Sequence, residues 1–424
     1  MERKIMTFLQ KWQKDILRKP LILYGPKQVG KTYTAVDFGK RCYKTVVYFN
    51  TENNKRLEMI FDKEKAMDKI IMRLELLSGE TIFKNETLII LDNVNDPLIV
   101  KAMRTFGSEK NDYHIIMITS RRENLNAFKS ENFQYKGMTS MDFEEYLLAL
   151  EKQELVEFIK ESFTRSKTMP YHSMAMDLFH DYLLTGGFPE VVAARLNHLE
   201  EPLINATIQK IYDTYQKETI LMRNVVDTIR SVEVLNSIPY QLTRSSKKFQ
   251  YGLIAPGKRS KDYENCIDFL VNNQMVYRSY KISEVKSPLS SCREKDSFKL
   301  YYNDCGLLYF LLHTSKREFF MDSKIKGAMY ENYVAKCLAE AGFPLYYYQS
   351  EGKAYLKFVI QNRMGKVIPI DICMDGENKS KSLAIFLSKY PATDAIRFTE
   401  DNFKTRHEVR YIPIYAAFCL NDNR

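Results

Sequence analysis

The first residues whose types and spacing could do chemistry form the loop Gly25-Pro26-Lys27-Gln28-Val29-Gly30-Lys31-Thr32, which has the spacing G-x-x-x-x-G-K-[ST]. Such a loop places backbone N–H groups around a phosphate, and its glycines let the backbone approach closely. Lys31 would reach the β- and γ-phosphates, and the hydroxyl of Thr32 would coordinate Mg²⁺. We therefore predict a nucleoside triphosphate site at residues 25–33, with Tyr33 as its last contact.

A carboxylate suited to the same metal ion ends the apolar run "TLIILD", residues 87–92. Asp92 would organise Mg²⁺, but the next position, where ATPases of this general type place a water-activating glutamate, is Asn93. An amide cannot accept a proton at neutral pH, and losing a positioned general base costs roughly 10²–10⁴-fold in rate. Asp96 would substitute only if the chain turned helical there. We predict that ATP binding survives and that turnover is slow or absent.

Strands and helices must position these residues, and the pattern up to about residue 120 supplies them. Short apolar runs rich in β-branched or aromatic residues alternate there with helical patterns. The runs are residues 21–24, 45–50, 87–92 and 114–119. Strands that alternate with helices favour a parallel sheet covered on both faces. The predicted fold class is therefore α/β, and the phosphate-binding loop lies between the first strand and a helix, as its chemistry requires.

Beyond residue 140 the pattern becomes mainly helical and then mixed. Residues 141–160 are typical of a long amphipathic segment in a helical stretch, and we expect further helices at 261–273 and 327–342. The expected strands are residues 275–282, 354–361, 366–373 and 412–418. These changes predict three domains, at residues 1–165, 166–314 and 315–424.

Over nearly all of its 424 residues the chain resembles the prokaryotic AAA-type ATPases that join a P-loop domain to a C-terminal domain of unknown function with a restriction-endonuclease-like fold. The motifs that carry the resemblance include "GPKQVGKTY", "TLIILDN", "MTSMDFEEYLLA", "YLLTGGFPEVV", "FKLYYNDCGLL" and "ENYVAK". The resemblance implies ATP and Mg²⁺ as cofactors, a helical lid and winged-helix middle, and a C-terminal α/β domain. It also implies that Arg121 senses the γ-phosphate, unless it is a solvated loop arginine. Pro189 of "GGFPEV" would lie near the adenine ring, unless the two glycines only cap a helix.

A nuclease-like site in the last domain also follows from the resemblance. Restriction-type nucleases surround one or two metal ions with a helix glutamate, a strand aspartate and an acid-x-lysine pair. Glu331 matches the helix acid and Asp371 the acid of the pair, whereas Lys357 replaces the strand aspartate and Cys373 the lysine. Two of the four functional residues are lost. We therefore expect a degenerate scaffold without nuclease activity, in which Lys357 could pair with Asp371.

A basic segment lies between residues 244 and 261 and contains six cations and no acid. The cations are Arg244, Lys247, Lys248, Lys258, Arg259 and Lys261. Its place among helices and before a strand suits a winged helix that could bind DNA. A solvated surface, or a winged fold used for packing, explains the segment at least as well.

The composition sets wider limits on the function. The net charge of +10 allows a polyanionic partner, and seven scattered cysteines without C-x-x-C fit a reducing cytoplasm. The longest apolar run, residues 307–312, is too short to span a membrane. An ATP-binding switch with weak or absent hydrolysis is the leading hypothesis. The alternatives are a DNA-coupled ATPase completed by Arg121, Arg122 or a neighbouring chain's arginine, a metal-dependent nuclease, and a nucleotide-stabilised scaffold. DNA, a second copy of the chain or an unidentified protein are the expected partners.

Overall fold

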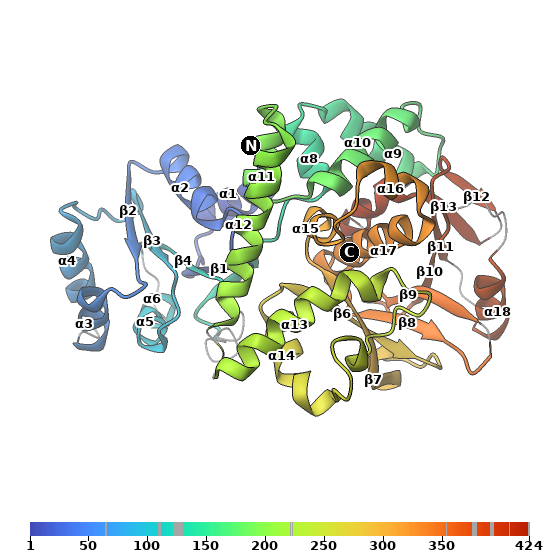
Figure 1. Ribbon diagram of the computed structural model, residues 1–424. Coiled ribbons are helices and arrows are strands. Elements are labelled where there is room, and N and C mark those ends of the chain that lie inside the picture. Colours follow the sequence, from blue (N-terminus) through green and yellow to red (C-terminus); the bar gives the residue numbers. More distant parts are fainter. Residues whose placement is uncertain are drawn as a thin grey trace. The chain divides into compact units, whose positions relative to one another are not determined.

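The chain divides into two compact units in a computed structural model, the first made of Met1–Ser140 with Asn272–Gln274 and the second of Met141–Val271 with Met275–Arg424 (Figure 1). The structure describes residues 1–63, 66–108, 112–121, 130–220, 222, 224–352, 354–374, 380–390, 394–406 and 408–422. This division differs from the three domains expected from the sequence, whose cuts fall near residues 165 and 314.

The N-terminal unit alternates strands and helices along the chain. Its helices are α1 (Ile5–Lys14), α2 (Lys31–Cys42), α3 (Lys55–Lys63), α4 (Met67–Ser78), α5 (Pro97–Met103) and α6 (Thr105–Ser108). Its strands are β1 (Leu21–Tyr24), β2 (Thr45–Asn50), β3 (Thr87–Asp92), β4 (His114–Thr119) and β5 (Gln134–Gly137). The first four strands occupy the residues predicted for them, because each is a short apolar run bounded by turn residues.

One parallel sheet in the order β2-β3-β4-β1-β5 organises this unit. Alternate residues of a strand point to opposite faces. On one face Ile89 and Leu91 of β3 share a buried core with α3, α4 and α5. On the other, Gly39 of α2 lies so close to the sheet that a Cβ there would meet Val46 and Leu88 at 2.7 and 3.1 Å. Helices therefore cover both faces, and the phosphate-binding loop leaves the central part of the sheet between β1 and α2.

The C-terminal unit begins with helices and continues into a second sheet. Its helices are α8 (Phe143–Ala149), α9 (Gln153–Arg165), α10 (His172–Thr185), α11 (Pro189–Leu196), α12 (Glu201–Thr219), α13 (Val225–Leu242), α14 (Ser260–Asn272), α15 (Cys305–Leu311), α16 (Lys316–Met321), α17 (Ser323–Glu340) and α18 (Lys381–Lys389). Its strands are β6 (Val276–Ile282), β7 (Arg293–Tyr302), β8 (Leu345–Gln349), β9 (Tyr355–Gln361), β10 (Val367–Ile372), β11 (Ala395–Thr399), β12 (Lys404–Arg406) and β13 (Val409–Pro413). Short 3₁₀ segments cover Tyr251–Leu253, Leu289–Cys292 and Ile414–Asp422.

The second sheet has eight strands in the order β12-β13-β11-β10-β9-β8-β6-β7. Strand β6 pairs with β7 and with β8, so the strand that we expected at residues 275–282 in a separate middle domain belongs to the same sheet as the C-terminal strands. Helix α17 is buried all round from Ala328 to Leu338. Its Asn332 accepts from the backbone N–H of Tyr302 and donates to the carbonyl of the same residue, which ties α17 to β7. Polar side chains on so buried a helix need partners inside the protein.

The segment at residues 141–160 is mainly helical, in two helices, because the chain breaks after α8 and Glu151 takes a positive φ of 58°. One expected strand is wrong in part. Residues 414–418, expected to extend a strand, are 3₁₀-helical and buried. A continuously buried apolar run has no periodicity that separates strand from helix. In the described part of the chain, no helix combines the length and apolarity that crossing a membrane would require.

Candidate nucleotide-binding site

The phosphate-binding loop has the backbone that its glycines make available. Gly25 has a φ of 151°, and a Cβ there would lie 1.9 Å from the carbonyl oxygen of Met138. Gly30 has a φ of 90° and directly precedes α2, and Gln28 also has a positive φ, of 66°. Because α2 has 12 residues and starts at Lys31, its free N–H groups and positive end adjoin the loop. The loop therefore has the form of an anion cradle.

Two basic side chains hold the loop in this form. The buried Lys31 donates through Nζ to the carbonyl oxygens of Gly25, at 2.9 Å, and Pro26, at 2.6 Å. Arg3, which is also buried, donates to the carbonyl oxygens of Val29 and Thr139, both at 2.8 Å. The segment before α1 thus helps to hold the loop in place through Arg3. Tyr33, the last predicted contact, is 68% exposed at the start of α2.

The predicted metal ligands lie together. The Thr32 hydroxyl donates to Asp92 Oδ2 at 2.7 Å, and the Tyr48 hydroxyl donates to the same oxygen at 2.9 Å. Asp92 is 4% exposed at the end of β3, next to the end of β2 from which Tyr48 projects. Burial and the Asp92 carboxylate raise the pKa of Tyr48 to about 12, so its hydroxyl stays protonated and keeps donating at neutral pH.

Asn93 occupies the position of the expected glutamate. Its backbone N–H donates to Asp92 Oδ1 at 2.8 Å, and its side-chain Nδ2 donates to Asn50 Oδ1 at 3.1 Å. Its φ is 58°, a left-handed conformation that asparagine adopts far more readily than most residues. The Thr51 hydroxyl donates to the carbonyl oxygens of both Asp92 and Asn93, which keeps this turn in place. Asparagine at this position therefore suits the backbone.

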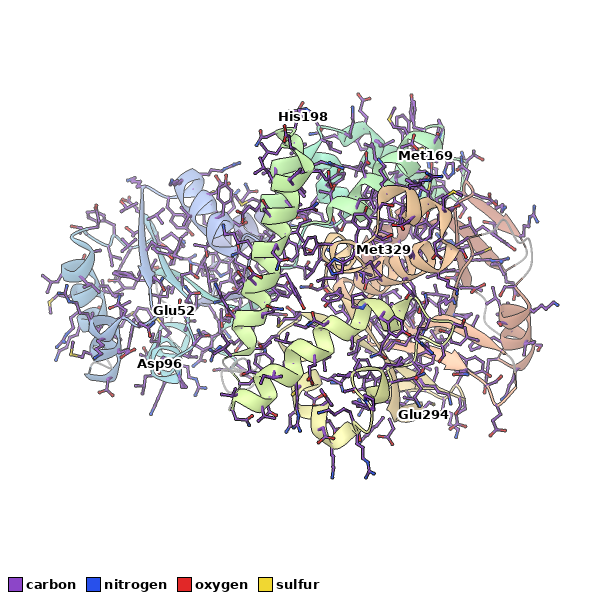
Figure 2. All side chains as sticks on the ribbon, in the orientation of Figure 1. Glu52, Asp96, Met169, His198, Glu294 and Met329 are labelled. Atoms are coloured by element: carbon purple, nitrogen blue, oxygen red, sulfur yellow. The ribbon has the colours of Figure 1, made fainter. Side chains whose placement is uncertain are left out.

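Asp96, the other acid that we considered as a base, is used structurally. It is the N-cap of α5, and its Oδ1 accepts from the backbone N–H of Leu98 at 2.8 Å. Figure 2 labels Asp96 in the N-terminal unit. A carboxylate engaged at a helix N-terminus is stabilised as an anion and held in one orientation. This arrangement does not favour Asp96 as a substitute base.

Arg121 lies at the carboxyl end of β4, between the strand that carries Asp92 and the strand that leads to the loop. The backbone joins these parts directly, since Gly25 N–H donates to the Thr119 carbonyl at 3.3 Å. The N–H of Arg121 donates to the Thr119 hydroxyl at 3.1 Å. Arg121 is half-buried at the carboxyl end of β4, and its contact with the γ-phosphate stays a prediction. Arg122, the alternative arginine, lies outside the described residues.

The "GGFPEV" motif belongs to the C-terminal unit, where its glycines have packing roles. Gly186 ends α10 with a φ of 78°, and a Cβ there would lie 2.2 Å from Asp304 Oδ1. The N–H of Gly187 donates to Asp304 Oδ2 at 2.8 Å, and Pro189 is the first residue of α11. These contacts account for both glycines within their own unit. The predicted contact between Pro189 and adenine stays a prediction.

Of the residues predicted for a degenerate nuclease site in the C-terminal unit, Lys357 forms an ion pair with Glu331 of α17, whereas Asp371 and Cys373 have other partners. Oε2 of Glu331 accepts from Lys247 at 2.8 Å, and its Oε1 accepts from Lys299 at 2.5 Å and from the Tyr301 hydroxyl at 2.6 Å. The ammonium of Lys357, on β9, lies 3.9 Å from Oε2. Burial raises the pKa of Glu331, but the charges of the three lysines outweigh it and hold the pKa well below the ordinary value. Glu331 is therefore an anion neutralised by lysines.

The second acid of this site has a different partner from the one we expected. Asp371 on β10 lies 3.7 Å from the Nε of the buried Arg397, whereas the ion pair of Lys357 is with Glu331. Burial raises the pKa of Asp371. Cys373 follows β10, and its backbone N–H donates to the Phe398 carbonyl. Among the described residues, no group of three or more histidines, cysteines or acids could hold a metal ion.

The basic segment is not one solvated surface. The side chain of Lys247 is only 11% exposed, and besides Glu331 it bonds the carbonyl of Gly327 at 3.0 Å. Lys258 is half-buried, with its ammonium 5.9 Å from the centre of the Tyr263 ring. The exposed members are Arg244, Lys248, Arg259 and Lys261. Lys247 thus differs in kind from its neighbours in the sequence.

Sequence reasoning missed several residues of these sites, among them the following three. Tyr48 bonds Asp92, Arg3 braces the loop, and Lys299 neutralises Glu331. Only Lys299 had a usable signal, because a lysine inside the apolar run "FKLYY" must either lie on an exposed strand face or have a buried partner. For the other two, nothing local in the sequence indicates the partner.

Two family models match parts of the chain. Residues 17–147 match a model described as "AAA domain", and residues 176–318 match a model described as "Domain of unknown function (DUF8612)". No curated protein matches the chain. The first match spans the parallel sheet, the loop and Asp92, and the second includes the basic segment.

Three solved structures are weakly similar to the chain. A Walker-type ATPase of Pyrococcus abyssi has 13% identity and a TM-score of 0.43, over 73% of this chain and 95% of its own. Drosophila ORC bound to DNA has 13% identity and a TM-score of 0.26, over 69% and 89%. The Hef helicase domain of Pyrococcus furiosus has 14% identity and a TM-score of 0.20, over 66% and 81%. These scores are too low to carry an argument. The family match and the site together identify the N-terminal part of the chain as an AAA-type nucleotide-binding domain with a P-loop.

Proposed function

We propose that this protein is an ATP-binding switch whose hydrolysis is slow or absent. The proposal rests on one observation: Asn93 directly follows Asp92, and its side-chain amide is hydrogen-bonded to Asn50. An amide cannot take a proton from water at neutral pH. Asp96 is engaged as a helix cap, which supports the same conclusion.

The residues of the site fit ATP and Mg²⁺. The loop carries backbone N–H groups at the start of a long helix, which suits phosphates, and Lys31 supplies a positive charge. Thr32 and Asp92, whose oxygens lie 2.7 Å apart, would hold the ion. Mg²⁺, when bound, neutralises phosphate charge and orients the phosphates. Arg121 would contact the γ-phosphate and so distinguish ATP from ADP.

Phosphate release from the purified protein with Mg-ATP tests the hydrolysis half of the proposal. We expect slow release by the wild type and faster release by Asn93→Glu. The gain should be smaller than the roughly 10²–10⁴-fold of a well-placed base, because a left-handed backbone costs glutamate about 1 kcal/mol. Asn93→Gln is the matched control, because glutamine has the side-chain length and the backbone strain of glutamate at this position but lacks the carboxylate. Rapid wild-type turnover that Lys31→Ala abolishes would refute slow hydrolysis.

The switch half needs a measurement of shape. A ligand shifts a conformational equilibrium only by the difference between its affinities for the two states. We expect ATP and ADP to differ in affinity and to give different hydrogen-exchange protection in the C-terminal unit. Arg121→Lys should narrow this difference, because lysine lacks the bidentate geometry of arginine. Equal affinities with unchanged exchange would rule out a switch.

A DNA-coupled ATPase is the second candidate, and four exposed cations of the basic segment favour it. Each cation that binds a DNA phosphate should contribute about one to the slope of log affinity against log salt. The triple variant Lys248→Ala, Arg259→Ala, Lys261→Ala should then reduce the slope by about three, and Lys286→Ala, at an exposed ion pair elsewhere, should leave it unchanged. Lys247 is unsuitable for this test because its removal unbalances Glu331.

We also propose that the C-terminal sheet with α17 is a restriction-endonuclease-like scaffold that has lost nuclease chemistry. Glu331, Lys357 and Asp371 come from the helix and the two strands that the resemblance implies. Lysines surround Glu331, and positive charge at this position would repel a divalent cation. DNA cutting over a range of divalent metals, lost on Asp371→Ala, would contradict this proposal.

A further inference from the structure

Glu331 and the three lysines beside it, Lys247, Lys299 and Lys357, form what we call the Glu331 cluster. A small cavity of about 260 Å³ opens beside this cluster in the C-terminal unit. Its lining residues come from the end of α13, the start of α17, β9 and the end of β10. They are Thr243, Arg244, Ser245, Lys247, Ser323, Lys324, Gly327, Glu331, Lys357, Ile372 and Met374. The lining includes Glu331 and Lys357, two of the four residues that the resemblance assigns to a nuclease site, and the residues on either side of Cys373.

The charge around this cavity is strongly positive. Four cationic side chains line it against one carboxylate, Glu331. That carboxylate is already satisfied, because Lys247, Lys299 and the Tyr301 hydroxyl occupy its two oxygens. Arg244 and Lys324 form no ion pair with any residue that the structure describes. A concave site with unneutralised cations attracts anions and disfavours metal ions.

The polar groups of the cavity are suited to a phosphate in particular. Two hydroxyls, from Ser245 and Ser323, can donate alongside Arg244 and the lysines, whereas the hydroxyl of Thr243 donates to the carbonyl oxygen of Tyr240 at 2.9 Å. Charge-assisted hydrogen bonds of this kind are short and strong, and phosphate offers several acceptor oxygens for them. The volume lies below the usual range for a complete small-molecule ligand. It suits one terminal group of a larger molecule.

A larger cavity of about 790 Å³ adjoins the first and shares with it Thr243, Arg244, Ser245 and Lys324. Its other lining residues are Asn236, Pro239, Tyr240, Ser246, Leu311, Leu312, Asp322 and Ile325. The carboxylate of Asp322 is engaged as the cap of α17. Arg244 donates to the Tyr240 hydroxyl at 2.7 Å, and its guanidinium lies 5.4 Å from the centre of that ring, so the two residues adjoin where the cavities meet. Tyr240 is still 55% exposed, and with the apolar side chains it offers a surface for a flat, uncharged group such as a base.

We propose that these joined cavities bind a terminal phosphate together with its nucleoside, supplied either as a free nucleoside monophosphate or as the phosphorylated end of a nucleic-acid strand. Lys357 and Arg244 hold the phosphate, and Tyr240 contacts the base. The degenerate nuclease site is then a binding site, in which lysine replaces the metal ion as the neutraliser of phosphate charge.

Calorimetric titration of the full chain carrying Lys31→Ala, which weakens the P-loop, tests this assignment. AMP should bind, adenosine should bind much more weakly, and inorganic phosphate should compete with AMP. Adding Lys357→Gln or Arg244→Gln should weaken AMP binding roughly tenfold or more, as expected for the removal of hydrogen bonds to a charged group. The matched control is Lys286→Gln, which removes the same charge from an exposed ion pair. Thermal unfolding shows whether each variant folds. If Lys357→Gln does not fold, Lys324→Gln, at an exposed residue, takes its place in the titration.

Single-stranded oligonucleotides with a 5′-phosphate or a 5′-hydroxyl separate the two sources. Tighter binding of the phosphorylated strand than of AMP assigns the site to strand ends, and equal binding assigns it to free nucleotides. The inference fails if AMP does not bind at millimolar concentration and the 5′-phosphate gives the strand no advantage. It also fails if AMP binding is unchanged by Lys357→Gln, Arg244→Gln and Lys324→Gln in folded protein.

Discussion

The sharpest consequence of the Glu331 cluster concerns stability, and Glu331→Gln tests it. The substitution keeps the volume of the side chain and removes the one negative charge. Lys247 at 2.8 Å, Lys299 at 2.5 Å and Lys357 at 3.9 Å would then face one another without an anion. Lys299 and Glu331 are each 1% exposed, so water cannot replace the missing charge.

Breaking a buried ion pair by removing one partner costs about 3–5 kcal/mol, because an uncompensated charge stays buried. At about 2 °C for each kcal/mol in a unit of this size, the melting temperature should fall by roughly 6–10 °C. A matched pair nearer the surface behaves differently. Glu294, which lies 3.1 Å from Lys281 and is labelled at the edge of the C-terminal unit in Figure 2, is 36% exposed. Its change to glutamine should cost about 0–1 kcal/mol.

Thermal unfolding followed by circular dichroism at pH 7 is the assay. The double variant Glu331→Gln, Lys299→Met should melt higher than Glu331→Gln alone, because it also removes a buried positive charge. The coupling between the two changes should be about 0.5–3 kcal/mol. If Glu331→Gln melts within about 2 °C of the wild type, as expected of Glu294→Gln, the cluster is not a compensated buried charge and our account of it is refuted.

Three further predictions concern the loop and the pH dependence of stability. Arg3→Ala should weaken ATP binding by about tenfold, because the loop loses two hydrogen bonds to its backbone and surroundings; equilibrium binding beside the exposed control Lys11→Ala checks this. Gly25→Ala should abolish ATP binding, since its Cβ would lie 1.9 Å from Met138 O; an unchanged dissociation constant would contradict the loop geometry. Burial lowers the pKa of Lys247 to about 8 despite Glu331, so between pH 8 and 10 the unfolded state binds more protons and unfolding free energy should rise with pH. The rise should be about 1 kcal/mol per pH unit and should be smaller in Lys247→Met, where Lys299, whose pKa burial also lowers, still contributes; melting temperatures from pH 7 to 10 would show this.

Parts of the fold and site were predictable because their signals are local. The strands at residues 21–24, 45–50, 87–92 and 114–119 lie where the apolar runs predict them. The expectation of a strand through 412–418 was wrong because a fully buried run carries no periodicity. We expected a separate middle domain and did not foresee that β6 pairs with β8, about 66 residues further along the chain. Local patterns cannot show pairing between strands so far apart in the sequence.

By itself, the sequence determined the phosphate-binding loop, the acid that follows β3 and the asparagine beside it. Each depends on residues adjacent in the chain and on the backbone conformations that glycine and asparagine permit. Only the tertiary structure decided which side chains complete these sites. Tyr48 reaches Asp92 across 44 positions and Lys247 reaches Glu331 across 84. A buried charge must find an opposite charge or a hydrogen bond within a few ångströms, and the packing of helices against the sheet, which no local pattern records, determines which residue lies there.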